Sequence, residues 1–212
     1  MSDYEALRES VIKGDIKSAV DETQQAMERG SSVQGILDRG LIAAMDEVGE
    51  RFSRGIMFVP QMLRSAKTMQ ECMKLIQPHF KEGDFTAKGK VVLGTVKGDL
   101  HDIGKNLVAM MMEGAGFMIT DLGVDVSPEK FVEKVKEVNA DILGMSALLS
   151  TTMPAMRDTI DALHRAGMRE SVKVLIGGAP VTEKYAAEIH ADAYAPDAGS
   201  AVTRAKKLLD IS

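Results

Sequence analysis

Residues 99–106 read DLHDIGKN and directly follow the apolar run VVLGTV at 91–96. Asp99 stands two residues before His101, near enough for its carboxylate to accept a hydrogen bond from one ring nitrogen of the imidazole. Such a bond orients a metal-binding histidine and raises its basicity, while the other ring nitrogen points outward. Gly104 removes a side chain from the start of the following helix, where a bulky planar ligand needs room. The alternative is an ordinary solvated loop histidine.

A zinc centre is a poor match to this loop, because zinc needs several protein ligands and the loop offers one histidine with aspartates. The nearest other histidines, His79 and His164, belong to different predicted elements. A single protein ligand suits a metal whose remaining positions are filled by a macrocycle. The loop therefore favours a metal held mainly by a cofactor.

Short β-branched runs alternate with helical segments in the second half of the chain. The predicted strands are 91–96, 117–120, 141–146, 173–178 and 192–195, and the helices that follow them are 103–114, 128–138, 153–166, 181–189 and 199–209. Strands that are each followed by a helix require a parallel sheet covered on both faces. We therefore predict a flavodoxin-like domain, a doubly wound parallel five-stranded sheet with the strand order 2-1-3-4-5.

In this strand order, ligands bind outside the carboxyl ends of the strands, between the first and third strands. Polar and small residues gather at these ends: Asp99 to Gly104 after the first strand, SALLSTT (146–152) after the third, and Gly177, Gly178 and Ala179 after the fourth. The glycines permit close approach of a large group, and the hydroxyls of SALLSTT stand on otherwise apolar walls. Each signal is weak alone, since a glycine pair is commonly a turn. Their shared location indicates one ligand that touches all three loops.

The first half of the chain has apolar residues at helical spacing, interrupted by glycines. We predict helices near 4–12, 16–28, 33–51 and 59–78, which form a small four-helix bundle. The polar, glycine-bearing stretch 79–90 has the composition of an interdomain linker. The predicted domains are therefore 1–88 and 89–212.

Composition excludes several classes of partner. The 26 basic and 31 acidic residues give a formal charge of -5, whereas nucleic-acid surfaces need a clustered positive field. Cys72 is the single cysteine, so no internal disulfide can form and a reducing, cytoplasmic location is expected. No apolar stretch approaches the roughly 18 residues of a membrane span, and the N-terminus lacks a secretion signal. We expect neither a nucleic-acid nor a membrane partner.

The segment GTVKGDLHDIGKN (94–106), with Asp99, His101 and Gly104 at its core, resembles the cobalamin-binding signature of methionine synthase and of the small corrinoid proteins of one-carbon methyltransferase systems. MSALLSTTM (145–153) and IGGAP (176–180) match the same family in order and spacing. GERFSRGIMFVPQML (49–63) resembles its cap domain. The resemblance covers essentially the full chain, and the length fits the stand-alone carriers better than a fragment of methionine synthase.

The resemblance implies that His101 is the lower axial cobalt ligand, in place of the cofactor's own dimethylbenzimidazole. Asp99 then holds the imidazole, and Thr152 completes the relay where methionine synthase has a serine, a substitution that keeps the hydroxyl. The other implied cofactor contacts lie in the first loop, along the path of the displaced tail and in the last loop: Asp102, Ile103, Gly104, Ser146, Leu148, Ser150, Gly177, Gly178, Ala179, Tyr194, Ala195 and Asp197.

In the helical half, five residues align with the segment of the cap that shields the upper, methyl-bearing face of the corrinoid: Phe58, Val59, Pro60, Met62 and Leu63. Packing of Phe58 and Met62 in the bundle core is an equally weighted alternative.

The resemblance further implies a methyl carrier that catalyses neither transfer on its own. The implied cofactor is cobalamin or a related corrinoid that carries the methyl group and passes through Co(I), Co(II) and Co(III) states. The implied partners are a donor-specific methyltransferase, an acceptor methyltransferase that uses tetrahydrofolate or coenzyme M, and a reductive activase. Methanol, methylamines, glycine betaine and aryl methyl ethers all stay open as donors, because donor choice resides in the partner enzyme.

Two other functions of cobalamin-binding domains are weighed against the carrier. A cobalamin-dependent sensor in a transcription regulator needs a DNA-binding segment, and the first 30 residues have balanced charge and no basic recognition helix. A mutase subunit would share the histidine loop but usually lacks the helical cap. The carrier is the favoured interpretation.

Overall fold

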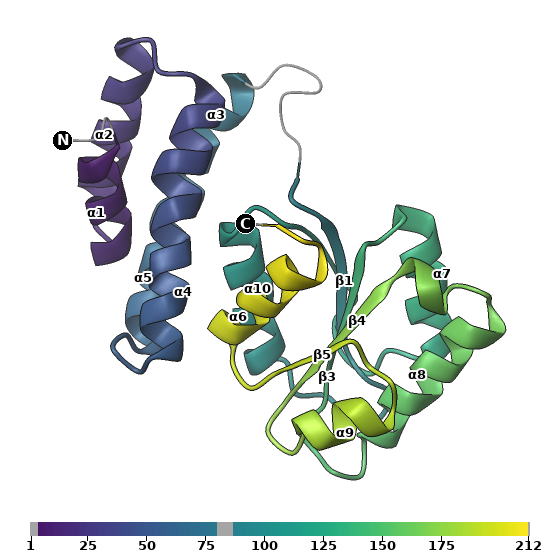
Figure 1. Cartoon of the computed structure of the whole chain (residues 1–212). Coiled ribbons are helices and arrows are strands. Elements are labelled where there is room, and N and C mark those ends of the chain that lie inside the picture. The colour runs from purple at the N-terminus through teal and green to yellow at the C-terminus, as the bar shows by residue number, and fades with distance from the viewer. Residues whose placement is uncertain (1–3, 80–86, 212) are drawn as a thin grey trace. The chain divides into compact units, whose positions relative to one another are not determined.

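The structure, a computed structural model, describes residues 4–79 and 87–211 (Figure 1). The chain divides into two compact units, one built on the residues up to Ala87 and one that begins at Lys88. Most of the predicted linker, residues 80–86, lies outside the described residues. The predicted boundary near residue 88 stays a prediction. None of the described helices is long and apolar enough to cross a membrane.

The helical unit is the predicted four-helix bundle. Its elements are α1 (Glu5–Lys13), α2 (Ile16–Glu28), α3 (Val33–Gly35), the π-helical segment η1 (Ile36–Ile42), α4 (Ala43–Ser53), α5 (Val59–Ile76) and the short η2 (Gln77–His79). The third helix therefore runs without a break from α3 through η1 into α4. The π-helical turn inside it was not predicted.

Close packing explains why glycine lies inside this third helix. A Cβ atom at Gly40 would lie 2.7 Å from Cδ2 of Leu7, a buried residue of α1.

Capping residues mark the break between α1 and α2. Gly14 ends α1 in the left-handed conformation, and the Asp15 side chain accepts a hydrogen bond from Ser18 N at the start of α2. Sequence signals of this kind made the bundle predictable.

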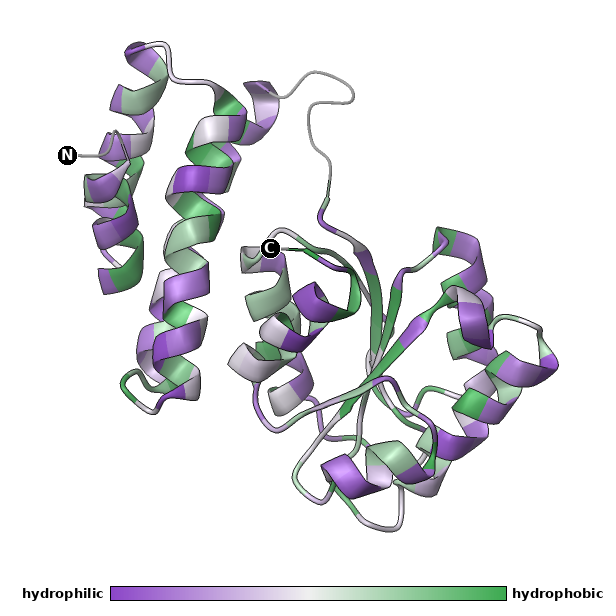
Figure 2. Cartoon of the chain, viewed as in Figure 1, coloured by the Kyte–Doolittle hydropathy of each residue, from purple (hydrophilic) through white to green (hydrophobic). Residues whose placement is uncertain are grey.

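The sheet unit confirms the predicted doubly wound, flavodoxin-like fold. The parallel strands β1 (Lys90–Thr95), β2 (Met118–Asp121), β3 (Ile142–Ser146), β4 (Lys173–Gly177) and β5 (Ala193–Ala195) lie in the order β2-β1-β3-β4-β5. The helices are α6 (Ile103–Gly114), α7 (Pro128–Val138), α8 (Pro154–Arg165), α9 (Glu183–Glu188) and α10 (Ala198–Leu208), with a short η3 (Arg169–Ser171) before β4. Figure 2 shows the strands mostly in the hydrophobic colour, as expected for a sheet buried on both faces.

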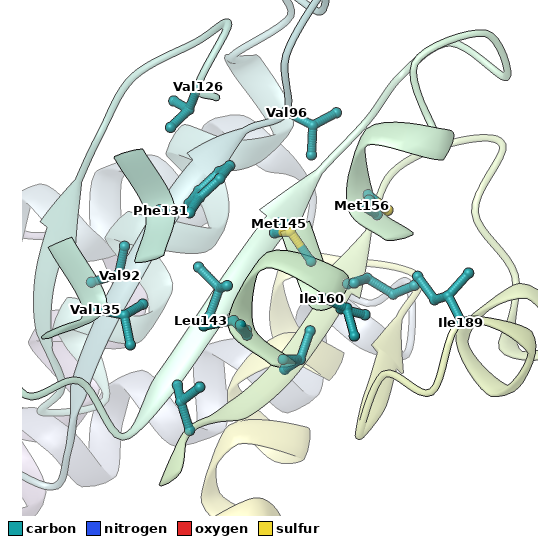
Figure 3. Close-up of a cluster of buried hydrophobic side chains, with 14 of the residues drawn as sticks. Val92, Val96, Val126, Phe131, Val135, Leu143, Met145, Met156, Ile160 and Ile189 are labelled. Atoms are coloured by element: carbon teal, nitrogen blue, oxygen red, sulfur yellow. The ribbon is translucent and has the colours of Figure 1, made fainter. Parts of the chain in front are cut away.

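One face of the sheet packs against α7, α8 and α9. Phe131 from α7, Met156 and Ile160 from α8, and Leu143 and Met145 from β3 lie together in a buried cluster (Figure 3). Alternate residues of β1, β3 and β4 contribute to the same cluster. The residues between them must point to the opposite face, on the side of α6 and α10.

On that opposite face, the last residues of four strands form a row of small side chains. Thr95 pairs with Ser146, Ser146 with Gly177, and Gly177 with Ala195. Thr95 and Ala195 are buried. The row crosses the carboxyl edge of the sheet and includes the switch point between β1 and β3.

Tight packing on the cluster face predicts a large cost for one added methyl group. In Gly94→Ala, the new Cβ atom would lie 2.7 Å from Cε1 of the fully buried Phe131 and 3.2 Å from Cγ2 of Val126. We expect unfolding in urea, followed by circular dichroism, to show a loss of about 1–3 kcal/mol. The matched control is Gly104→Ala, where the new Cβ atom would meet nothing within 4 Å. Equal stability of the two variants would contradict the packing described for this face.

Candidate functional site

The loop after β1 places a buried carboxylate beneath a half-exposed imidazole. Asp99 Oδ1 lies 2.7 Å from His101 Nδ1 and accepts a hydrogen bond from His101 N at 3.0 Å. Asp99 Oδ2 accepts hydrogen bonds from Leu148 N at 2.8 Å, from Leu149 N at 3.4 Å and from the Thr152 hydroxyl at 2.7 Å. The Asp99 side chain is 0% exposed and that of His101 is 50% exposed. The predicted relay of Asp99, His101 and Thr152 is thus assembled in space.

These hydrogen bonds determine the ionisation state of Asp99. Burial alone would raise the pKa of the carboxyl, because it removes the charged form from water. The N–H groups of Leu148 and His101, the Thr152 hydroxyl and the His101 ring all donate to the carboxylate and together hold its pKa well below its ordinary value of 3.8. Asp99 is therefore ionised at neutral pH.

An ionised Asp99 in turn selects the tautomer of His101. A carboxylate can only accept hydrogen bonds, so the proton of the neutral imidazole must lie on Nδ1. The lone pair then lies on Nε2, to which no described residue is hydrogen-bonded. In that tautomer the arrangement presents a nitrogen donor on a partly exposed ring, which is the form that binds a metal ion.

The loop after β3 is shaped to hold Asp99. The Thr152 hydroxyl lies 2.7 Å from Asp99 Oδ2 and 2.9 Å from the carbonyl oxygen of Leu149. It can donate to one of these oxygens at a time, and the carboxylate is the stronger acceptor. Residues 148–152 thus wrap around the carboxylate with two N–H groups and one hydroxyl.

The loop after β4 lies directly against the loop after β3. Gly178 has φ +126°, and a Cβ atom there would lie 1.9 Å from the carbonyl oxygen of Ala147. Ala147 N also donates to the Gly177 carbonyl oxygen at 3.2 Å. Gly178 is therefore required by the fold itself, in addition to any role toward a ligand.

Apolar side chains are exposed around the imidazole. Leu100 is 72% exposed and Ile103 is 78% exposed, and they flank His101 in the chain. Leu148 and Leu149, whose N–H groups hold Asp99, also have exposed side chains. Large apolar side chains gathered at a polar centre indicate a binding surface.

Gly104 and Asp102 lie at the start of α6. Glycine at 104 is required neither by a positive φ nor by packing, because a Cβ atom there would meet nothing within 4 Å. Asp102 is exposed, its carboxylate accepts from Asn106 Nδ2 at 3.2 Å, and its carbonyl oxygen accepts from Asn106 N. Asp102 thus stabilises the first turn of the helix, whereas Gly104 leaves space in front of it.

The remaining predicted contacts lie farther from the relay. Tyr194 packs against the cluster face of the sheet, opposite the small row. The Asp197 carboxylate caps α10 by accepting from Ser200 N at 2.8 Å. Ser150 and Ala179 are exposed in their loops. The roles predicted for these residues stay predictions.

The helical unit carries an exposed apolar group at the start of α5. Phe58 is 66% exposed, and Ile56, Val59 and Leu63 are also exposed. Gln61 Oε1 accepts from Phe58 N at 3.0 Å and fixes the helix start. Met62, by contrast, is fully buried in the face of α5 that includes Ala66 and Met69. Met62 is thus a core residue of the bundle, whereas Phe58 is not.

Three residues near the Asp99–His101–Thr152 relay were not predicted from the sequence to belong to the site. The buried Thr95 hydroxyl donates to the His101 carbonyl oxygen at 2.8 Å. The Lys105 side chain is buried and forms an ion pair with Asp121 at the end of β2. Thr95 and Asp121 could have been suspected, because Thr95 ends the first strand and Asp121 opens the polar stretch DLGVD (121–125) at the same carboxyl edge.

Comparisons with known proteins identify the family to which the chain is similar. Residues 89–204 match the model of a family described as B12 binding domain, and residues 4–77 match a second family with the same description. The chain is 45% identical over 201 residues to dimethylamine corrinoid protein 2 of Methanosarcina acetivorans, covering 94% of this chain and 91% of that relative.

Two solved structures are similar to this chain over nearly all of its length. The crystal structure of a cobalamin-binding protein from Desulfitobacterium hafniense DCB-2 has a TM-score of 0.83 at 34% identity, covering 96% of this chain and 97% of that one. The methanol:cobalamin methyltransferase complex MtaBC from Methanosarcina barkeri has a TM-score of 0.86 at 26% identity, covering 98% of this chain and 79% of that one.

The depressed pKa of Asp99 predicts a pH-dependent contribution to stability. Because the folded state holds the ionised form, the stabilisation is complete above the ordinary pKa of 3.8 and is lost as the pH falls below that value. We expect Asp99→Asn to lower the free energy of unfolding by about 2–3 kcal/mol at neutral pH. The difference from the wild type should shrink in acid, as measured by urea unfolding across pH. Asp161→Asn, at an exposed position, is the control, and a difference independent of pH would contradict the assignment.

Proposed function

The chain belongs to the family of corrinoid proteins with B12-binding domains, and from that premise we propose that His101 Nε2 is the lower axial ligand of the corrinoid cobalt. Its function is that of a corrinoid methyl carrier in a methyltransferase system, and its cofactor is cobalamin or a related corrinoid. The observation that carries the proposal is the bond between the buried Asp99 carboxylate and His101 Nδ1. That bond leaves Nε2 as the donor atom at the carboxyl edge of the sheet.

The surroundings of His101 fit a large planar macrocycle. The exposed side chains of Leu100, Ile103, Leu148 and Leu149 offer an apolar surface on which such a ring can lie. Gly104 keeps the start of α6 free of a side chain, and no other protein atom lies within 4 Å of where its Cβ would be. That space is therefore open to a ligand. These features support a corrinoid that lies over the loops after β1 and β3.

The small row supports a path for the displaced nucleotide tail of the cofactor. Thr95, Ser146, Gly177 and Ala195 are adjacent in the strand register and carry hydroxyl, hydrogen or methyl side chains. We propose that the tail enters along this row on the side of α6 and α10. We further propose that the cofactor is contacted at the edge of this site by Ser150, Gly178, Ala179, Asp102 and the 194–197 loop.

The chain's own residues act by orientation. When bound, the corrinoid would supply the cobalt centre that can accept and give up a methyl group. His101 offers Nε2 to the lower face, Asp99 keeps the ring in one tautomer, and Thr152 keeps the carboxylate in place. No residue near His101 is proposed to act as a nucleophile toward the methyl group.

The exposed group on the helical unit supports the role of a cap. We propose that Phe58, Val59 and Leu63, together with Ile56, cover the upper face of the corrinoid, because large apolar side chains are otherwise rarely left in water together. Met62 contributes by holding α5 in the bundle core.

We propose three partner proteins and a cytoplasmic location. The partners would be a donor-specific methyltransferase, an acceptor methyltransferase that uses tetrahydrofolate or coenzyme M, and a reductive activase. The relative named for dimethylamine makes a methylated amine the first donor class to test. The single cysteine supports the cytoplasm, where thiols stay reduced.

Removal of the imidazole tests the ligand directly. The apoprotein is loaded with cobinamide, a corrinoid that lacks its own base, and reduced to Co(II). We expect the wild type to show a nitrogen triplet in the electron-spin spectrum and His101→Ala to lose it. His164→Ala, at an exposed position on α8, is the matched control and should keep the triplet. A triplet retained in His101→Ala would refute the assignment.

The space at Gly104 gives a second test that separates binding from folding. In Gly104→Leu the added side chain meets no protein atom near its Cβ, so thermal stability should not fall. The side chain would occupy the space proposed for the corrinoid, and affinity should fall about ten- to a hundredfold, as expected for overpacking of a binding site. Equilibrium dialysis with cobalamin measures the affinity. Unchanged binding in a stable Gly104→Leu protein would place the corrinoid elsewhere.

A further inference from the structure

Asp125 forms hydrogen bonds with the backbone immediately before and after the Asp99 side chain. Its Oδ1 atom accepts a hydrogen bond from Gly98 N at 2.7 Å, and its own N–H donates to the Asp99 carbonyl oxygen at 3.0 Å. Asp125 lies in the loop after β2, the strand next to β1 on the side away from β3. One residue from a neighbouring loop therefore fixes the peptide unit that precedes Gly98 and the peptide unit that follows Asp99.

Asp125 holds this position in a strained conformation. Its φ of +53° lies in the left-handed region, which non-glycine residues adopt infrequently. The flanking chain is tied to β1, because Val126 N donates to the Thr95 carbonyl oxygen and Thr95 N donates to the Gly123 carbonyl oxygen. Such a conformation persists only where the surroundings over-determine it, and these positions cluster at functional sites.

The peptide units that Asp125 holds determine where the Asp99 carboxylate points. The carboxylate must meet the His101 ring with one oxygen, and Leu148 N and the Thr152 hydroxyl with the other, at distances of 2.7–2.8 Å. Gly98 has φ +83°, and as a glycine it can adopt many other conformations once its N–H is released. A small rotation there would break one of the two sets of bonds.

We propose that Asp125 is a positioning residue of the His101 site. By holding the peptide units of Gly98 and Asp99, it aligns the Asp99 carboxylate, which then fixes the Nδ1–H tautomer and the ring orientation of His101. Asp125 is exposed and acts through Asp99, since among the described residues its hydrogen bonds go to Gly98 N and the Asp99 carbonyl oxygen and not to the imidazole. The inference rests on the proposed role of His101 as the cobalt ligand.

Three substitutions at the same position separate the hydrogen bond from the backbone strain. Asp125→Asn keeps an acceptor oxygen and tolerates the left-handed conformation. Asp125→Gly removes the acceptor and relieves the strain, whereas Asp125→Ala removes the acceptor and retains the strain. Asp210→Ala is the matched control, because Asp210 has the same φ of +53° and its carboxylate accepts no hydrogen bond from the described residues.

The first readout needs no cofactor. Long-range proton–nitrogen correlation spectra of the apoprotein report the tautomer of His101. We expect Asp125→Ala and Asp125→Gly to raise the population of the Nε2–H tautomer about fivefold, the effect of one lost hydrogen bond. Asp125→Asn and Asp210→Ala should match the wild type.

The second readout is the nitrogen triplet of the Co(II) cobinamide-loaded protein. We expect a weakened triplet in Asp125→Ala and Asp125→Gly, and rescue in Asp125→Asn. Wild-type tautomer and triplet in both acceptor-free variants would overturn the proposal, as would a loss in Asp125→Asn equal to that in Asp125→Ala. If Asp125→Ala fails to fold, the comparison of Asp125→Gly with Asp125→Asn tests the proposal in its place. A wild type without a triplet would refute the ligand role of His101, while the apoprotein tautomers would still test Asp125.

Discussion

The hydrogen bond between Asp99 Oδ1 and His101 Nδ1 is the interaction on which the site depends. It is strong because Asp99 is both buried and ionised, a state that costs free energy unless the charge is fully hydrogen-bonded. The donors that meet this requirement come from the loop after β3 and from His101 itself. Several backbone N–H groups thus donate to one carboxylate and keep it ionised. The ionised carboxylate in turn favours a single tautomer of His101.

The strand order explains why these donors meet. In the order β2-β1-β3-β4-β5, the helices after β1 and β3 leave on opposite faces, so the loops after the two strands diverge above the sheet. Asp99 lies in one of these loops, and Leu148 and Thr152 lie in the other. On the outer side, Asp121 at the end of β2 pairs with Lys105, and Asp125 in the loop after β2 bonds Gly98 N. The His101 loop is therefore held from both neighbouring strands.

Much of this arrangement could be predicted from the sequence, for identifiable reasons. The fold followed from the alternation of apolar strands and helical segments, and Asp99 and His101 are so close in the chain that their contact depends little on the fold. The participation of Thr152 came from the resemblance to a known family. The role of Asp125 was not predicted, because it depends on a left-handed φ at a non-glycine residue and on the hydrogen bond that this conformation makes to Gly98 N. Phe58 and Met62 show the same limit, since apolar residues of one helix start can be exposed or buried according to the packing of the bundle.

The most direct test of the account identifies the nitrogen on the lower face of the cobalt. The protein is produced with nitrogen-15 in its four histidines, loaded with ordinary cobalamin and reduced to Co(II). If the imidazole of His101 is the ligand, the axial nitrogen splitting in the electron-spin spectrum becomes a doublet in place of a triplet. A triplet that persists in the labelled protein would show that the cofactor's own base is still bound, and it would contradict the assignment of His101.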